Sequence, residues 1–208
     1  MKIPPGMILV MGAVLMAAAG FGAARWWTST HAPVTLNSGS LLSPPRDLPQ
    51  FSLIDQRGAA FTPASLLGHW SVLFFGYTNC PDLCPTTLAT LATLQREWHN
   101  RDVAYPRVVF VSVDVRRDTP AVLSKYVPYF DPAFVGVTSA TQVRIEEFAR
   151  GLGAAVIIGP EHDGTYSVDH TGALFVVSPQ GRLAAILTPP YTLAGLREDL
   201  ARVLSAGT

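Results

Sequence analysis

Apolar and polar residues form alternating blocks along most of the chain, and these blocks predict strands and helices in turn. Residues 72–77 (VLFFGY) and 107–113 (RVVFVSV) are continuous apolar runs, typical of central strands that are buried on both faces. Between them, residues 85–98 place leucines and a tryptophan at helical spacing. The pattern therefore predicts a buried strand, a helix and a second buried strand.

The rest of the chain supplies further elements of both kinds. We expect an opening hairpin around a turn at 55–58, a short helix at 63–67, helices at 120–130, 141–150 and 192–204, a strand at 134–137, a pairing of 154–158 with 166–168, and a hairpin of 173–177 with 183–187. Strands that alternate with helices and end in an antiparallel pair predict an α/β fold, a mixed sheet with helices on both faces. This is the outline of a thioredoxin-like fold with an extra N-terminal hairpin.

The first 27 residues depart from this pattern because they form one long apolar segment. Residues 3–24 carry no charge and lie between Lys2 and Arg25, with two tryptophans directly after. About 20 apolar residues suffice for a helix that crosses a bilayer, and tryptophans suit the membrane interface. We predict a single N-terminal transmembrane helix at residues 1–27, with a cleaved signal segment as the alternative. Either reading places the remaining chain outside the cytoplasm.

Proline, glycine and small polar residues dominate the next stretch. Residues 28–47 have the composition of a flexible linker. Residues 48–208 then form the expected globular domain, which is long enough to bury roughly 70% of its unfolded surface without a disulfide or metal staple.

The charge balance and the positions of the sulfur-containing residues limit the classes of function that are possible. Lys and Arg number 15, Asp and Glu also number 15, and the net charge is zero, so no basic excess favours nucleic acid. All four methionines lie in the first sixteen positions, so the domain offers a metal no thioether. Its two cysteines, Cys80 and Cys84, are too close together for a stapling disulfide framework. They indicate a redox pair or metal ligands.

The cysteine segment CPDLC, residues 80–84, leaves a predicted buried strand and enters a predicted helix. The helix N-terminus should lower the pKa of Cys84 and favour its thiolate, which is both a nucleophile and a ligand for soft metals. Buried structural thiols are a weaker reading because Thr78, Asn79 and Asp82 surround the pair with polar groups. Thioredoxin-type oxidoreductases have two residues between the cysteines, whereas this chain has three.

A histidine lies where a thioredoxin-like fold would bring it to the cysteines. Residues 168–172 (VDHTG) precede the apolar strand at 173–177, whose entry faces the cysteine turn in such folds. His170 could complete a site of two sulfurs and one nitrogen, and such donors suit copper. Asp169 could orient the imidazole or cap the end of the strand.

Three blocks of the chain resemble the Sco/SenC family of copper chaperones. They are residues 75–88 (FGYTNCPDLCPTTL), residues 111–120 with VSVD followed by RDTP, and residues 168–171 (VDHT), and the likeness spans about 48–204. The resemblance implies a thioredoxin-like fold, one N-terminal membrane helix, and a copper site formed by Cys80, Cys84 and His170. Asn79 and Thr171 depart from residues common in the family, but neither is an expected ligand.

The resemblance also implies a function. The chain would bind copper, as Cu(I) or Cu(II), and deliver it to the CuA site on the copper-bearing subunit of cytochrome c oxidase. The alternative is a membrane-anchored thiol–disulfide oxidoreductase that reduces the cysteines of that site, with Cys80 and Cys84 as its redox pair. A thiol peroxidase is a third reading, which the cysteine spacing and His170 disfavour.

Partners and location follow from the same resemblance. Besides the oxidase subunit, another copper chaperone or a thiol reductase is an expected partner. We expect a bacterial inner-membrane protein whose domain faces the periplasm. For Asp114 and the neighbouring Arg117–Asp118 pair we expect a turn with an exposed ion pair, or a role in partner docking.

Overall fold

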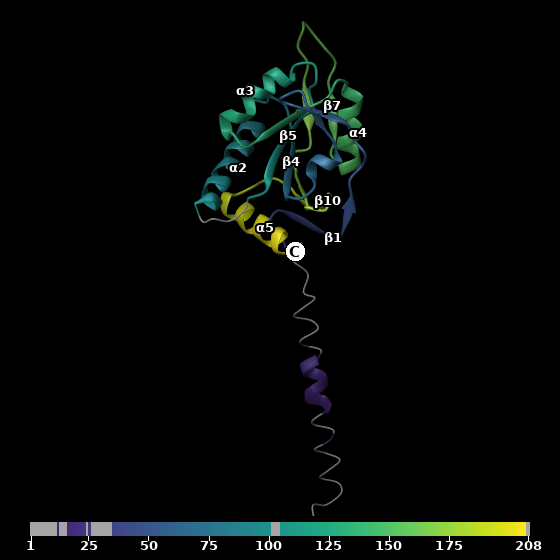
Figure 1. The fold of residues 1–208 in the computed structure, drawn as a ribbon, viewed down its shortest axis with the longest axis vertical. Helices are drawn as coiled ribbons and strands as arrows, with labels where there is room; N and C mark the ends of the chain where they lie inside the picture. The colour runs from purple at the N-terminus through teal and green to yellow at the C-terminus, as the bar shows by residue number, and fades with distance from the viewer. Residues whose placement is uncertain (1–11, 13–15, 24, 26–34, 101–104, 207–208) are drawn as a thin grey trace, which may run out of the picture. The chain divides into compact units, whose positions relative to one another are not determined.

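The computed structural model describes residues 12, 16–23, 25, 35–100 and 105–206 (Figure 1). The chain divides into two compact units, Met1–Val34 and Thr35–Thr208. Most of the anchor predicted at residues 1–27 lies outside the described residues. Within the described part of the chain, no helix is both long and apolar enough to cross a membrane.

A mixed sheet of eight strands forms the centre of the second unit. Its order is β1-β10-β9-β4-β5-β6-β2-β3, in which β4, β5 and β6 run parallel and their neighbours are antiparallel. The strands are β1 (Gly39–Asp47), β2 (Leu53–Asp55), β3 (Ala60–Phe61), β4 (Ser71–Gly76), β5 (Arg107–Ser112), β6 (Val135–Thr138), β9 (Leu174–Val177) and β10 (Arg182–Leu187). The α/β fold and the opening hairpin, β2 and β3, are as predicted.

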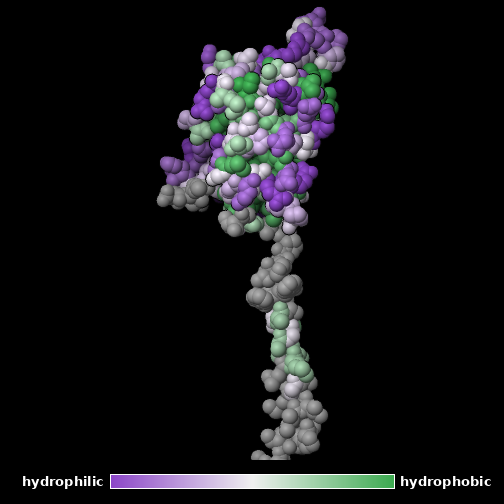
Figure 2. Space-filling model, turned by 45° about the vertical axis from the view of Figure 1, so that its right-hand side comes forward, coloured by the Kyte–Doolittle hydropathy of each residue, from purple (hydrophilic) through white to green (hydrophobic). Residues whose placement is uncertain are grey.

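Helices cover both faces of this sheet and enclose two cores. Alternate residues of the buried strands point to opposite sides, so that Val72 and Phe74 join one core while Leu73 and Phe75 join the other. The first core packs against α2 (Leu83–His99), α3 (Pro120–Phe130) and α5 (Leu193–Ala206). The second packs against α4 (Gln142–Leu152) and the short 3₁₀ helix η1 (Pro63–Leu66), and Figure 1 shows α4 across the sheet from α2 and α3. On the face of the molecule in Figure 2, hydrophobic residues occur in small groups among hydrophilic ones.

Two further strands form a small sheet of their own. β7 (Val156–Ile158) pairs antiparallel with β8 (Val168–His170), and Val156 lies opposite His170. The predicted pairing is confirmed, but β8 ends two residues later than expected. His170 is therefore the last residue of a strand.

Strand β1 corrects the C-terminal part of the linker predicted at residues 28–47. Gly39–Asp47 pairs with β10 at the edge of the sheet, with an irregularity in register between Leu41 and Arg46. Prolines are tolerated in an edge strand at such a bulge because no ladder hydrogen bond is lost there. The buried carboxylate of Asp199 accepts hydrogen bonds from the backbone N–H groups of Asn37 (2.6 Å) and Ser38 (2.9 Å). The folded unit therefore includes residues ahead of position 48.

Candidate metal centre

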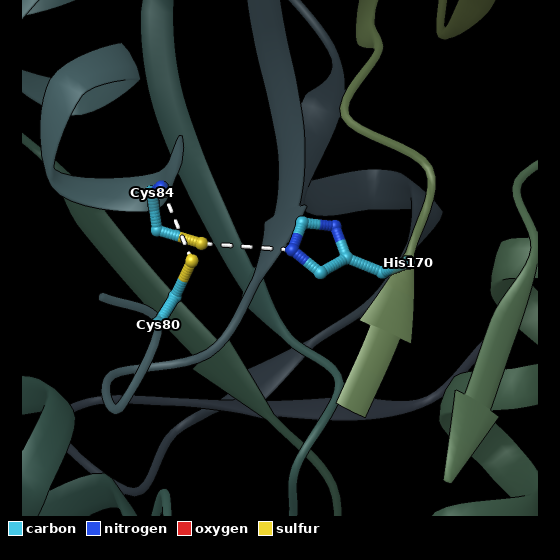
Figure 3. A group of neighbouring side chains, drawn as sticks. All are labelled: Cys80, Cys84 and His170. Carbon is cyan, nitrogen blue, oxygen red and sulfur yellow. Dashed lines mark hydrogen bonds between the residues drawn. The ribbon is translucent and has the colours of Figure 1, made fainter. Parts of the chain in front are cut away.

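The two cysteines lie on the loop after β4 and in the first turn of α2. The backbone N–H of Cys84 donates to Cys80 Sγ at 3.4 Å, and both thiols are free. Cys84 is fully buried in the first core, whereas Cys80 is half-buried. Figure 3 shows the two sulfurs side by side, facing His170. This loop and helix start form the sulfur arm of the site.

Two residues outside the CPDLC segment, Gly76 and Asp118, determine the position of the sulfur arm. A Cβ on Gly76, the last residue of β4, would lie 2.8 Å from Cys84 Sγ and 2.6 Å from the ring of Phe110, so only glycine fits there. Asp118 accepts hydrogen bonds from the backbone N–H of Thr78 (2.8 Å), from the Thr78 hydroxyl (2.5 Å) and from the Ser112 hydroxyl (2.6 Å). The first limits the residue at the strand end, and the second holds the loop in place.

The expectation of a low pKa for Cys84 is wrong. Burial raises the pKa of this thiol well above its usual range, and a backbone hydrogen bond from Tyr77 lowers it only in part. Proximity to a helix N-terminus favours the thiolate, but here loss of hydration outweighs that effect. In the absence of a metal ion, burial therefore favours the neutral thiol of Cys84.

His170, at the end of β8, forms the imidazole arm of the site and faces the two cysteines from the other side (Figure 3). His170 Nε2 lies 3.6 Å from Cys84 Sγ, and Nδ1 lies 3.2 Å from the carbonyl oxygen of Thr171. Its ring meets those of Phe74 and Tyr77 edge-on, with centroid separations of 6.2 and 5.8 Å. Burial lowers the pKa of His170, although the Thr171 carbonyl and the Asp169 charge act in the opposite direction. The neutral ring is favoured, and a proton on Nδ1 would leave the Nε2 lone pair facing the sulfurs.

Asp169 does not orient the imidazole. Its side chain is exposed, and successive residues of a strand point to opposite faces. The carbonyl of Thr171 contacts Nδ1 instead. Thr171 is itself held by two hydrogen bonds: its backbone N–H donates to the carbonyl of Ala155 (3.0 Å), and its hydroxyl oxygen accepts from the N–H of Ala155 (2.8 Å). This backbone partner has no sequence pattern that would reveal it.

The loop between β5 and α3 touches both arms. Asp118 binds the cysteine loop, and Asp114 accepts a 2.6 Å hydrogen bond from Tyr166, two residues ahead of β8. Asp114 also pairs with Arg117, whose guanidinium lies 4.0 Å from the centroid of the Tyr166 ring. Asp114 is only 1% exposed, so the expected exposed ion pair is wrong. Sequence reasoning missed Tyr166, Thr78 and Gly76 as supports of the site.

The structure brings all three predicted ligands together. One sulfur from Cys80, one from Cys84 and one ring nitrogen from His170 all lie within 4.8 Å of one another. Among the residues that the structure describes, this is the one group of three or more His, Cys, Asp or Glu side chains whose ligand atoms are close enough together to hold a metal ion. His69, His99 and His162 do not belong to it.

Comparison with known proteins assigns the chain to a family. A family model described as SCO1/SenC matches residues 42–205. The chain belongs to the SCO1/SenC family. It is 34% identical over 171 residues to a Stutzerimonas stutzeri protein named as a candidate copper-binding protein, covering 81% of this chain and 83% of the relative. It is 36% identical over 152 residues to the mitochondrial SCO2 homolog of Bos taurus, covering 72% of this chain but 55% of that protein.

Solved structures of family members share the fold. Copper-bound ScoI from Arabidopsis thaliana has a TM-score of 0.70 at 30% identity, covering 76% of this chain and 98% of that one. Apo Sco1 from Thermus thermophilus has a TM-score of 0.70 at 32% identity, covering 82% and 97%. The SCO1/SenC chain described here therefore has the predicted thioredoxin-like fold.

Proposed function

We propose that this chain carries one copper ion as cargo, held by Cys80 Sγ, Cys84 Sγ and His170 Nε2, and delivers it to the CuA site of cytochrome c oxidase. The observation that carries the proposal is the convergence of these donors from two separate parts of the fold. Two sulfurs and an imidazole form a soft donor set that suits Cu(I). With metal–ligand distances of about 2.0–2.3 Å, as for zinc, the donors of a trigonal site lie about 3.5–4.0 Å apart. The 3.6 Å between Cys84 Sγ and His170 Nε2 fits that requirement.

Because Cys84 is buried as a thiol, copper binding here requires the loss of its proton. The ion replaces the thiol protons and supplies the positive charge that the buried sulfur lacks. Cys80 is the more exposed sulfur, so an incoming thiolate of the receiving protein reaches the ion on that side. When Cys80 leaves the ion, the N–H of Cys84 at the helix start faces its sulfur and stabilises the thiolate. Transfer then proceeds by exchange of one ligand at a time.

Reduction of the oxidase cysteines is the second candidate. The contact between Cys84 N–H and Cys80 Sγ, which holds the two sulfurs close together, favours it because a dithiol couple needs such a pair. The raised pKa of Cys84 opposes both disulfide exchange and metal binding, because each needs a thiolate, but a bound copper ion would supply the positive charge that offsets it. The imidazole 3.6 Å from the buried sulfur also favours copper, because it supplies a third donor to a metal, whereas a dithiol couple needs only the two sulfurs.

We also propose that residues 1–27 anchor the chain in a bacterial inner membrane with the domain in the periplasm. The uncharged run at residues 3–24 supports this location. Fractionation and protease treatment of spheroplasts should find the full-length chain in the membrane and its domain accessible from outside. A soluble or protected chain would contradict the proposal.

The decisive test of copper carriage is a Cu(I) titration of the reduced unit, residues 35–208, against a competing chelator. We expect one copper per chain and a loss of at least about tenfold in affinity on His170→Ala, because a directly bound donor should matter at least as much as the supporting groups around a metal. The exposed His162→Ala is the matched control and should bind as the wild type does. If His170→Ala kept full affinity, or if no copper were retained, the oxidoreductase would become the better explanation.

A further inference from the structure

A groove opens beside the cysteine loop, along the outer surface of α3. It has a volume of about 480 Å³, and its lining residues are Thr78, Ala121, Val122, Lys125, Tyr126 and Tyr129. Apolar groups dominate its walls. None of these residues holds the metal in the site described above, so the groove needs an explanation of its own.

Helix α3 carries apolar residues on its outer side as well as on the side that packs on the sheet. Leu123 and Val127 are buried against the sheet. Val122, Tyr126 and Tyr129 follow one another four and three residues apart and line the groove; Tyr126 is half-buried against the first core, whereas Val122 and Tyr129 face outward. Val122 is 37% exposed and Tyr129 is 85% exposed. Folding explains the buried residues but gives no reason for an aromatic ring held almost wholly in solvent.

One charge lies among the groove residues of α3. Lys125 is the sole charged residue in the α3 sequence PAVLSKYVPYF, and it is exposed. No carboxylate lines the groove, and the ion pairs found in the described part of the chain do not include Lys125. An apolar groove with an unmatched ammonium group complements an apolar side chain that has a carboxylate beside it.

The groove is continuous with the metal centre. Thr78 forms part of its wall, lies two residues before Cys80 and is fixed to Asp118, which directly precedes the N-cap of α3. A protein seated in the groove would therefore lie next to the more exposed of the two sulfurs. That is the side from which a receiving thiolate must approach.

We propose that this groove docks the protein that receives the copper. An apolar side chain of that protein enters between Val122 and Tyr129, and a neighbouring carboxylate pairs with Lys125. This inference rests on the proposed function and names the surface that selects its partner. Docking at α3 brings the receiving ligands to Cys80 without using any of the three metal ligands.

The test measures copper transfer from the full-length, copper-loaded chain in detergent. The acceptor is the apo copper-bearing domain of the cytochrome c oxidase subunit from the same organism. Tyr129→Ser and Lys125→Glu should each slow transfer at least about tenfold and leave copper affinity unchanged, since central aromatic and charged contacts dominate such interfaces. Val143→Ser and Arg144→Glu, which make the same kinds of change at exposed positions on α4, should transfer as the wild type does. Rising salt should slow wild-type transfer and have less effect on Lys125→Glu.

Each other outcome has a separate meaning. Normal transfer by Tyr129→Ser and Lys125→Glu would overturn the docking surface and leave copper carriage intact. A wild-type chain that binds no copper, or binds it and transfers none, would overturn the proposed function and the docking surface with it. Self-association of the wild type that Tyr129→Ser abolishes, with transfer unchanged, would assign the groove to a second copy and overturn the proposal.

Discussion

The sulfur arm and the imidazole arm of the site are built in different ways. Cys84 lies in the first turn of a 17-residue helix and is packed into the larger core. His170 ends a three-residue strand in a two-stranded sheet, where Ile157 is 61% exposed and Asp169 is exposed as well. A buried helix start opens only when much of the core opens, whereas a short surface hairpin can open locally. Damage to the sulfur arm should therefore cost stability, and damage to the imidazole arm should chiefly cost copper affinity.

The strongest test of this difference is Gly76→Ala. The added Cβ would lie 2.6 Å from the Phe110 ring and 2.8 Å from Cys84 Sγ, so the core must shift to admit it. We expect the free energy of unfolding to fall by about 1–3 kcal/mol, the usual range for overpacking. Copper affinity should fall as well, because the displaced atom is a ligand. Urea unfolding and chelator competition measure both, and wild-type values in both would show that the strand end has room.

Asp118→Ala should have the next largest effect. It removes the acceptor of the buried Ser112 hydroxyl and of the half-buried backbone N–H of Thr78, at about 1–3 kcal/mol for unsatisfied buried groups. Chemical denaturation should show this loss, and copper titration should show weaker binding because the loop that carries Cys80 loosens. Asp118→Asn keeps an acceptor oxygen and should recover part of both quantities. Equal behaviour of the two variants would contradict a role for these hydrogen bonds.

Tyr166→Phe should act on the imidazole arm alone. It removes the hydrogen bond to Asp114 and should cost about 1 kcal/mol locally. Amide hydrogen exchange should accelerate in β7 and β8 while exchange in α2 stays unchanged. Faster exchange in both regions would mean that the two arms are not independent.

Asp169→Asn should have the smallest effect. The side chain is exposed, and Thr171, not Asp169, contacts Nδ1. Stability should change by less than about 0.5 kcal/mol, and copper affinity should change by less than about twofold, since no ligand moves. A tenfold loss of copper affinity would restore Asp169 as the residue that positions His170.

The sequence pattern was enough to predict those elements whose structure depends on neighbouring residues alone. The apolar runs at β4 and β5 could be assigned because buried strands need apolar residues on both faces. Helix α3 has the predicted bounds because Thr119 caps it and Pro120 suits its first turn. The three donors could be found because their residue types, their spacing and the resemblance all pointed to them.

Long-range contacts decided the features that the sequence did not reveal. Residues 39–47 read as a linker because the partners that order this part of the chain, β10 and Asp199, lie far along the sequence. The pKa of Cys84 could not be foreseen because the depth of its burial depends on the strands behind it. The support that Asp114 gives to Tyr166 crosses 52 positions and has no local pattern.

The separate sheet of β7 and β8 leaves the third donor outside the strand pairing of the eight-stranded sheet. The hydrogen bonds of its strand pair run between β7 and β8 and not to the eight-stranded sheet. A hairpin that brings a thioether, a carboxylate or no donor at all could be grafted between Gly153 and Ala173 if it keeps the apolar residues at positions 154 and 168, which are buried in the second core. The scaffold thereby separates the choice of metal from the strand pairing of the eight-stranded sheet, which makes this hairpin a natural starting point for redesigning the site.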